Sequence, residues 1–150
     1  MRNTLILLLA IATSFTLNSC DNYVKETELF SSYLFNHYDK NLEDKLYIII
    51  PQNICISCVD KMQAKIEKRK DKSKNYIVIL ADYTSVTFQK PKEQLKDFEV
   101  LEDNKMNIIK EKIIIGTNIV LINVFQGNID EIIGYTPFIN DEQIENLLDK

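Results

Sequence analysis

One short segment constrains the fold more than any other: an apolar run that ends at Pro51 and leads into two cysteines spaced as Cys-x-x-Cys. Residues 46–50 are apolar throughout and mostly β-branched or aromatic, which predicts a strand buried on both faces. After Cys55 and Cys58, apolar residues recur at the spacing of one helix face, at Val59, Met62 and Ile66. The two thiols are therefore expected where a strand gives way to a helix.

This placement favours a reactive dithiol. The first turn of a helix carries a partial positive charge of roughly half an elementary unit. A thiolate beside it is stabilised, so the pKa of Cys55 is expected to fall from about 8.5 to between about 3.5 and 7.5. A purely structural disulfide is the alternative. In the chain-entropy model it would stabilise a loop of about four residues by only roughly 2 kcal/mol, against nearly 5 kcal/mol for about 100 residues.

The first 20 residues predict export and lipidation. A positive start followed by an apolar stretch over residues 5–12 has the organisation of a secretory signal, and it is too short to span a bilayer. Leu17, Ser19 and Cys20 resemble a bacterial lipobox. That resemblance implies that residues 1–19 are cleaved as a signal peptide and that Cys20 carries the lipid anchor. An ordinary signal with an incidental cysteine is the alternative.

Charge and cysteine count narrow the compartment and the partners. Loss of Arg2 with the signal takes the formal charge from −4 to −5, which argues against nucleic acid as a partner. With Cys20 lipidated, the three cysteines leave Cys55 and Cys58 as one pair outside the cytoplasm, where disulfides form. Three glycines and a single histidine offer neither a glycine-rich phosphate loop nor a hydrolase triad.

The rest of the chain predicts one α/β domain over residues 26–150, joined to the anchor by a tether at 20–25. The expected elements are helices over 26–37 and 58–70, strands over 46–50 and 76–81, a short edge strand over 98–101, a helix after Asp103 or Asn104, a β-hairpin over 119–135, and a last helix capped by Asn140 with Gln143 in capping-box register.

Two other features are predicted to be structural. His37 falls at the edge of the first helix face. The basic run over 67–74 is expected to complement a helix end and continue as a solvated loop, with attraction to anionic lipid headgroups as the alternative.

The order of elements, with Cys55-Ile56-Ser57-Cys58 after a buried strand, resembles the thioredoxin fold, in particular the membrane-anchored thioredoxins of the TlpA and redoxin type. The resemblance covers about residues 26–150 and implies a three-layer α/β sandwich around a mixed sheet. It implies a thiol–disulfide oxidoreductase in which Cys55 attacks a target disulfide and Cys58 resolves the mixed disulfide. Its partners would be exported protein thiols and a membrane redox protein, and no cofactor or metal is implied.

Three departures from that family are visible in the sequence. The family's cis-proline before the hairpin, which contacts the substrate, is replaced by Thr117 and Asn118. The aromatic residue usual before the first cysteine is replaced by Ile54, and residues 46–50 contain no buried acid.

Two other functions therefore stay open. One is a copper chaperone, since Cys55, Cys58 and Met62 would supply soft sulfur ligands for Cu(I). The other is a non-catalytic binding lipoprotein that has kept the fold.

Overall fold

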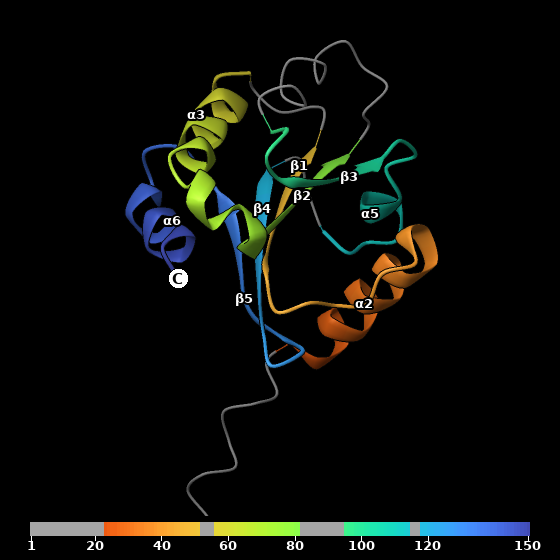
Figure 1. Cartoon of the computed structure of the whole chain (residues 1–150). Coiled ribbons are helices and arrows are strands. Elements are labelled where there is room, and N and C mark those ends of the chain that lie inside the picture. The colour runs from red at the N-terminus through yellow and green to blue at the C-terminus, as the bar shows by residue number, and fades with distance from the viewer. Residues whose placement is uncertain (1–22, 52–55, 82–94, 115–117) are drawn as a thin grey trace, which may run out of the picture.

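The computed structural model describes residues 23–51, 56–81, 95–114 and 118–150. In chain order its elements are α2 (Val24–Tyr38), β1 (Leu46–Pro51), α3 (Ile56–Glu67), the 3-10 helix η1 (Lys70–Asn75), β2 (Tyr76–Ala81), β3 (Glu99–Asp103), α5 (Asn107–Lys110), β4 (Ile119–Phe125), β5 (Asn128–Tyr135) and α6 (Asp141–Leu148) (Figure 1).

The described strands form one mixed sheet of five strands in the order β3-β2-β1-β4-β5. β1 lies at its centre, parallel to β2 and antiparallel to β4, and β3 pairs with β2 in parallel. Every residue of β1 and of β2 is buried, as expected for apolar strands covered on both faces. The parallel pair needs a crossover connection, and α3 supplies it.

Helices cover both faces of the sheet, which makes the protein a three-layer α/β sandwich (Figure 1). On one face, α3 and α6 pack on alternate strand residues such as Ile48, Val78 and Leu121. On the other face, α2 and α5 pack on the intervening residues, among them Ile49 and Ile77. The period-two alternation of side chains along each strand therefore divides the core in two.

The β4–β5 hairpin closes through a two-residue turn, because Phe125 pairs with Asn128. The turn residues Gln126 and Gly127 have φ angles of 52° and 73°, the left-handed conformation that two-residue hairpin turns require. A bulge follows, where the register shifts between Asn123 and Val124.

Most predicted elements are confirmed, with boundaries shifted by a few residues. The predicted capping box of the last helix is wrong. Asn140 lies at the N-cap of α6 but makes no side-chain cap hydrogen bond. Its amide instead accepts from the Thr136 N–H at 3.0 Å and donates to the Gly134 carbonyl at 2.8 Å. Gln143 lies 3.4 Å from Glu131 on the neighbouring strand, because tertiary partners compete with the local motif.

The basic run at the end of α3 is partly neutralised by α6. Arg69 donates to Glu145 at 2.6 Å and to Asp149 at 2.8 Å, and Lys65 binds both Asp141 and Glu145. These ion pairs join two helices on one face of the sheet, and they support the structural interpretation of the run over lipid attraction. Among the described residues, no helix has both the length and the apolar character needed to cross a membrane.

Candidate functional site

Cys58 lies in the first turn of α3, directly after the central strand of the sheet. β1 ends at Pro51 and α3 begins at Ile56, so the predicted change from strand to helix is confirmed and Cys58 lies at the start of that helix. Val59 and Met62 anchor the helix in the core, which leaves Ile56 67% exposed and Cys58 half-buried.

Cys58 is disulfide-bonded. The chain has two other cysteines, Cys20 and Cys55, and both lie outside the described residues. The predicted roles of these two residues therefore stay predictions. Cys55 immediately precedes the first residue of α3 in the sequence.

The electrostatics of the α3 start favour a negative charge. The first three residues of the helix, Ile56, Ser57 and Cys58, include no acidic side chain. The partial positive charge of the helix start falls off within the first turn, so a thiolate gains most at the very start of the helix.

Asn118 lies at the same edge of the sheet as the start of α3. The antiparallel register pairs Ile49 with Val120, so two further residues along each strand bring Asn118 level with Pro51. Asn118 is exposed, whereas Thr117 lies outside the described residues. None of the peptide bonds described in the structure is cis. The position predicted from chain order is thus next to the strand that precedes the cysteines.

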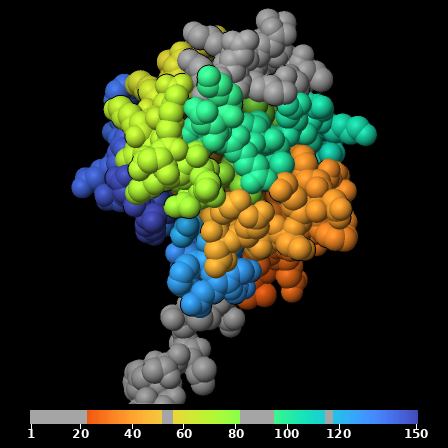
Figure 2. Space-filling model, viewed as in Figure 1, coloured from red at the N-terminus to blue at the C-terminus, as the bar shows by residue number. Residues whose placement is uncertain are grey.

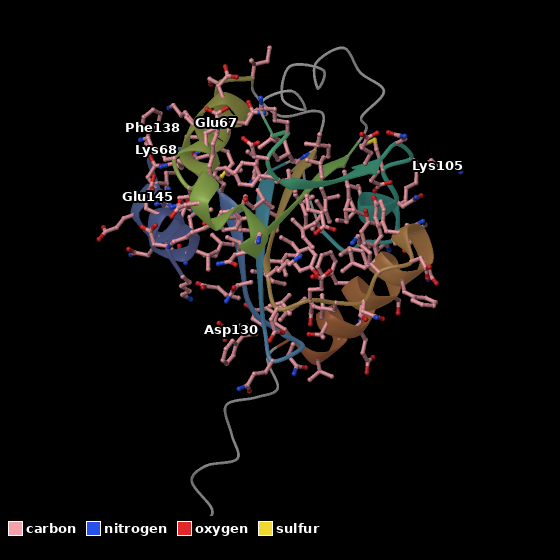
Figure 3. All side chains as sticks on the ribbon, in the orientation of Figure 1. Glu67, Lys68, Lys105, Asp130, Phe138 and Glu145 are labelled. Atoms are coloured by element: carbon pink, nitrogen blue, oxygen red, sulfur yellow. The ribbon has the colours of Figure 1, made fainter. Side chains whose placement is uncertain are left out.

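A third segment at this edge was missed by sequence reasoning. β5 ends at Tyr135, level with Ile119, and the loop after it carries Phe138 and Ile139, which are 82% and 81% exposed. The Lys61 ammonium on α3 lies 3.3 Å from the centroid of the Phe138 ring, so the loop packs against α3 at a residue three positions after Cys58. Figure 3 shows Phe138 beside this helix. A turn signal at Thr136-Pro137-Phe138 predicted the exit from the sheet but gave no sign of where the ring would lie.

A buried carboxylate lies across the sheet from the cysteine. Asp103 is 2% exposed and accepts hydrogen bonds from the Ile108 N–H at 2.8 Å and the Tyr33 hydroxyl at 3.2 Å. Burial raises the pKa of Tyr33, and it raises the pKa of the neighbouring Tyr38 to about 12, so both hydroxyls stay protonated. This cluster lies on the face of the sheet that α2 and α5 cover, opposite α3. The role of Asp103 there is structural, since it accepts the Ile108 N–H in the first turn of α5.

His37 also belongs to that opposite face. Its Nε2 lies 2.6 Å from Glu111, and its Nδ1 lies 3.3 Å from the Asn107 amide. These contacts join α2 to the α5 segment.

Two observations bear on a metal site. Met62 is fully buried in the core beneath α3, so its thioether is packed among apolar side chains. Within the described part of the chain, no group of three or more His, Cys, Asp or Glu side chains is placed to hold a metal ion.

Fold and site together define an α/β protein with a cysteine pair at the junction of its central strand and a covering helix. Comparison with known proteins finds no matching family model, no matching curated protein and no matching solved structure.

Proposed function

We propose that this chain is a lipid-anchored, extracytoplasmic thioredoxin-like protein that exchanges thiols and disulfides through Cys55 and Cys58. The observation that carries the proposal is the disulfide-bonded Cys58 in the first turn of α3, directly after the central strand. The parallel β1–β2 pair, the antiparallel hairpin and the last helix also follow the order implied by the resemblance to thioredoxins.

The proposed chemistry is a two-electron exchange. The Cys55 thiolate attacks one sulfur of a target disulfide, and the other target sulfur leaves as a thiolate that takes a proton from water. The resulting mixed disulfide is attacked by the Cys58 thiolate, which releases the second target sulfur. The target disulfide is thereby reduced and the Cys55–Cys58 pair is oxidised, and the reverse sequence oxidises a target dithiol.

Substrate would bind at the end of the sheet that carries the start of α3, Asn118 and the loop after β5. Asn118 offers an exposed amide beside the end of β1, while Phe138 and Ile139 offer apolar surface on the α3 side. An extended target segment could therefore contact both polar and apolar groups next to the sulfurs. Thr117 is proposed to share the role of Asn118 from the neighbouring position.

The proposed location is outside the cytoplasm, on a membrane facing the periplasm. Cleavage before Cys20 would remove residues 1–19 and leave lipid chains on the new N-terminus. A single acyl chain binds membranes only reversibly, so the two or three chains implied by the lipobox resemblance are what would make the anchor stable. The intact mass of protein purified from membranes measures both the cleavage and the lipidation.

The test of the exchange activity is a trapping experiment with a matched control. In Cys58→Ser, a mixed disulfide formed by Cys55 has no resolving thiol, so adducts with exported proteins should accumulate on a non-reducing gel. Cys55→Ser removes the proposed nucleophile and should give none. Equal adducts from both variants, or none from either, would contradict the assignment.

The reduction potential separates catalysis from a purely structural bridge. A value between about −270 mV and about −120 mV lies in the range of thiol–disulfide exchange proteins, whereas a structural disulfide lies below about −300 mV. The lower value would favour the non-catalytic binding lipoprotein. A copper chaperone would need the Met62 thioether as a ligand beside the cysteines. Met62 is instead fully buried among apolar side chains of the core.

A further inference from the structure

The end of the molecule farthest from Cys58 carries two exposed apolar side chains on adjacent segments. Val24, in the first turn of α2, is 48% exposed, and Phe125, at the start of the hairpin turn, is 60% exposed. The two segments lie together, because the Ile129 N–H donates to the Thr27 hydroxyl at 3.0 Å. We call Val24, Phe125 and the turn residues Gln126 and Gly127 the hairpin pole.

The hairpin pole and the cysteine lie at opposite ends of the sheet. β4 begins beside the end of β1 and runs seven residues to Phe125, a length of about 20 Å at the usual rise per residue. In Figure 1 the start of α2 and the hairpin lie at the lower end, whereas the first turn of α3 lies at the upper end, and Figure 2 shows the same separation on the surface.

The chain before α2 is short. Three peptide units connect Cys20 to Tyr23, the first residue that the structure describes, and they span at most about 11 Å when fully extended. If Cys20 carries the lipid, as proposed above, the start of α2 must stay within about that distance of the bilayer surface. Of the two ends of the sheet, the tether therefore brings the hairpin pole to the membrane.

The charges around this end point to apolar contact rather than electrostatic attraction. Lys25 and Glu26 follow Val24 along α2, and the Asp44 carboxylate accepts the Gly127 N–H at 2.7 Å. Asp130 lies at the same end of β5 (Figure 3). This mixture of signs would not draw the protein to anionic lipid, whereas an aromatic ring and a branched aliphatic side chain suit the headgroup boundary.

From these observations we infer that the hairpin pole rests on the bilayer, with Phe125 and Val24 inserted at the interface. The inference rests on the proposed acylation of Cys20 and adds an orientation to it. The α3 end then stands away from the membrane by about the length of β4. Target thiols and the redox partner must therefore approach Cys55 and Cys58 from the aqueous side, on domains that extend beyond the bilayer surface.

The test uses the absence of tryptophan from the sequence. Full-length acylated protein carrying Phe125→Trp is reconstituted in phosphatidylcholine vesicles whose acyl chains are brominated, and its fluorescence is compared with that in unbrominated vesicles. The matched control is Phe138→Trp, which replaces an aromatic ring at the α3 end that is 82% exposed, against 60% for Phe125. We expect bromine to quench Phe125→Trp at least twofold more strongly than Phe138→Trp.

Equal quenching of the two variants, or quenching of neither, would overturn the inference. Val24→Trp provides a second probe of the same pole, should Phe125→Trp fail to fold, and it is expected to be quenched in the same way. Failure of the proposed function is distinguished by other measurements: an intact mass without acyl chains removes the anchor and this inference together, whereas absence of mixed disulfides in Cys58→Ser removes only the exchange activity.

Discussion

The clearest stability prediction concerns Asp103, because one buried carboxylate oxygen accepts two hydrogen bonds. The Oδ2 atom accepts both the Ile108 N–H at 2.8 Å and the Tyr33 hydroxyl at 3.2 Å. In Asp103→Ala the Ile108 N–H would be left buried without its acceptor, at a cost of about 1–3 kcal/mol. Tyr33 would keep its contact with the Tyr38 hydroxyl at 3.1 Å and lose about 1 kcal/mol.

The two costs together predict that Asp103→Ala lowers the free energy of unfolding by about 2–4 kcal/mol, a large part of the 5–15 kcal/mol typical of a domain. Asp103→Asn keeps an oxygen at the same place and loses only the strengthening that the negative charge gives, about 1 kcal/mol. Urea denaturation followed by circular dichroism measures both values, and the dependence on urea concentration should be unchanged.

Asp130→Ala is the matched control, because this carboxylate is exposed and, among the described residues, accepts a side-chain hydrogen bond only from the Asn123 amide, at 3.2 Å. Its effect is expected to stay within about 0.5 kcal/mol. Two results would refute the reasoning: a loss below about 1 kcal/mol for Asp103→Ala, or an equal loss for Asp103→Asn and Asp103→Ala.

Three further predictions concern stability. The hydrogen bond from Lys65 holds the pKa of Glu145 below its usual range, although burial opposes it. This stabilisation is complete above the ordinary pKa and is lost as pH falls through the lowered one. Glu145→Gln should therefore melt at a lower temperature than wild type at pH 7, and the difference should shrink as the pH is taken down through the lowered pKa. Gly127→Ala should lower the free energy of unfolding by about 1 kcal/mol, because Gly127 has φ 73°. Gly134→Ala, with no atom within 4 Å of the added methyl, should be neutral or slightly stabilising in the same urea assay. Gln63→Leu should raise the free energy of unfolding by about 1 kcal/mol, because the Gln63 Nε2 is buried and has no hydrogen-bond partner in the part of the chain that the structure describes. A lower free energy of unfolding would indicate that this amide does form a hydrogen bond.

Sequence reasoning succeeded where a signal is repeated along the chain. The unbroken apolar run of residues 46–50 predicts a fully buried strand, and the structure confirms it at the centre of the sheet. Gly127 between two apolar runs predicts the hairpin, and its positive φ confirms the turn. Each of these features depends on residues that are neighbours in the chain, so local patterning suffices.

The same reasoning failed where a side chain chooses among distant partners. Asn140 and Gln143 have the spacing of a capping box, yet both bind groups outside the helix. α5 spans only four residues, since Met106 before it and Lys112 shortly after it both adopt left-handed conformations. Likewise, nothing near Phe138 in the sequence indicates that its ring would lie against Lys61 on α3.

The central position of β1 has a consequence for how the chain matures. Its parallel neighbour β2 follows within 30 residues, but its antiparallel neighbour β4 begins about 70 residues later. As the chain is synthesised from its N-terminus, one hydrogen-bonding edge of the apolar strand β1 therefore stays unpaired until β4 has been made. Such an edge is a site for mispairing with other chains, so a truncation before the hairpin should produce aggregates rather than a smaller folded protein.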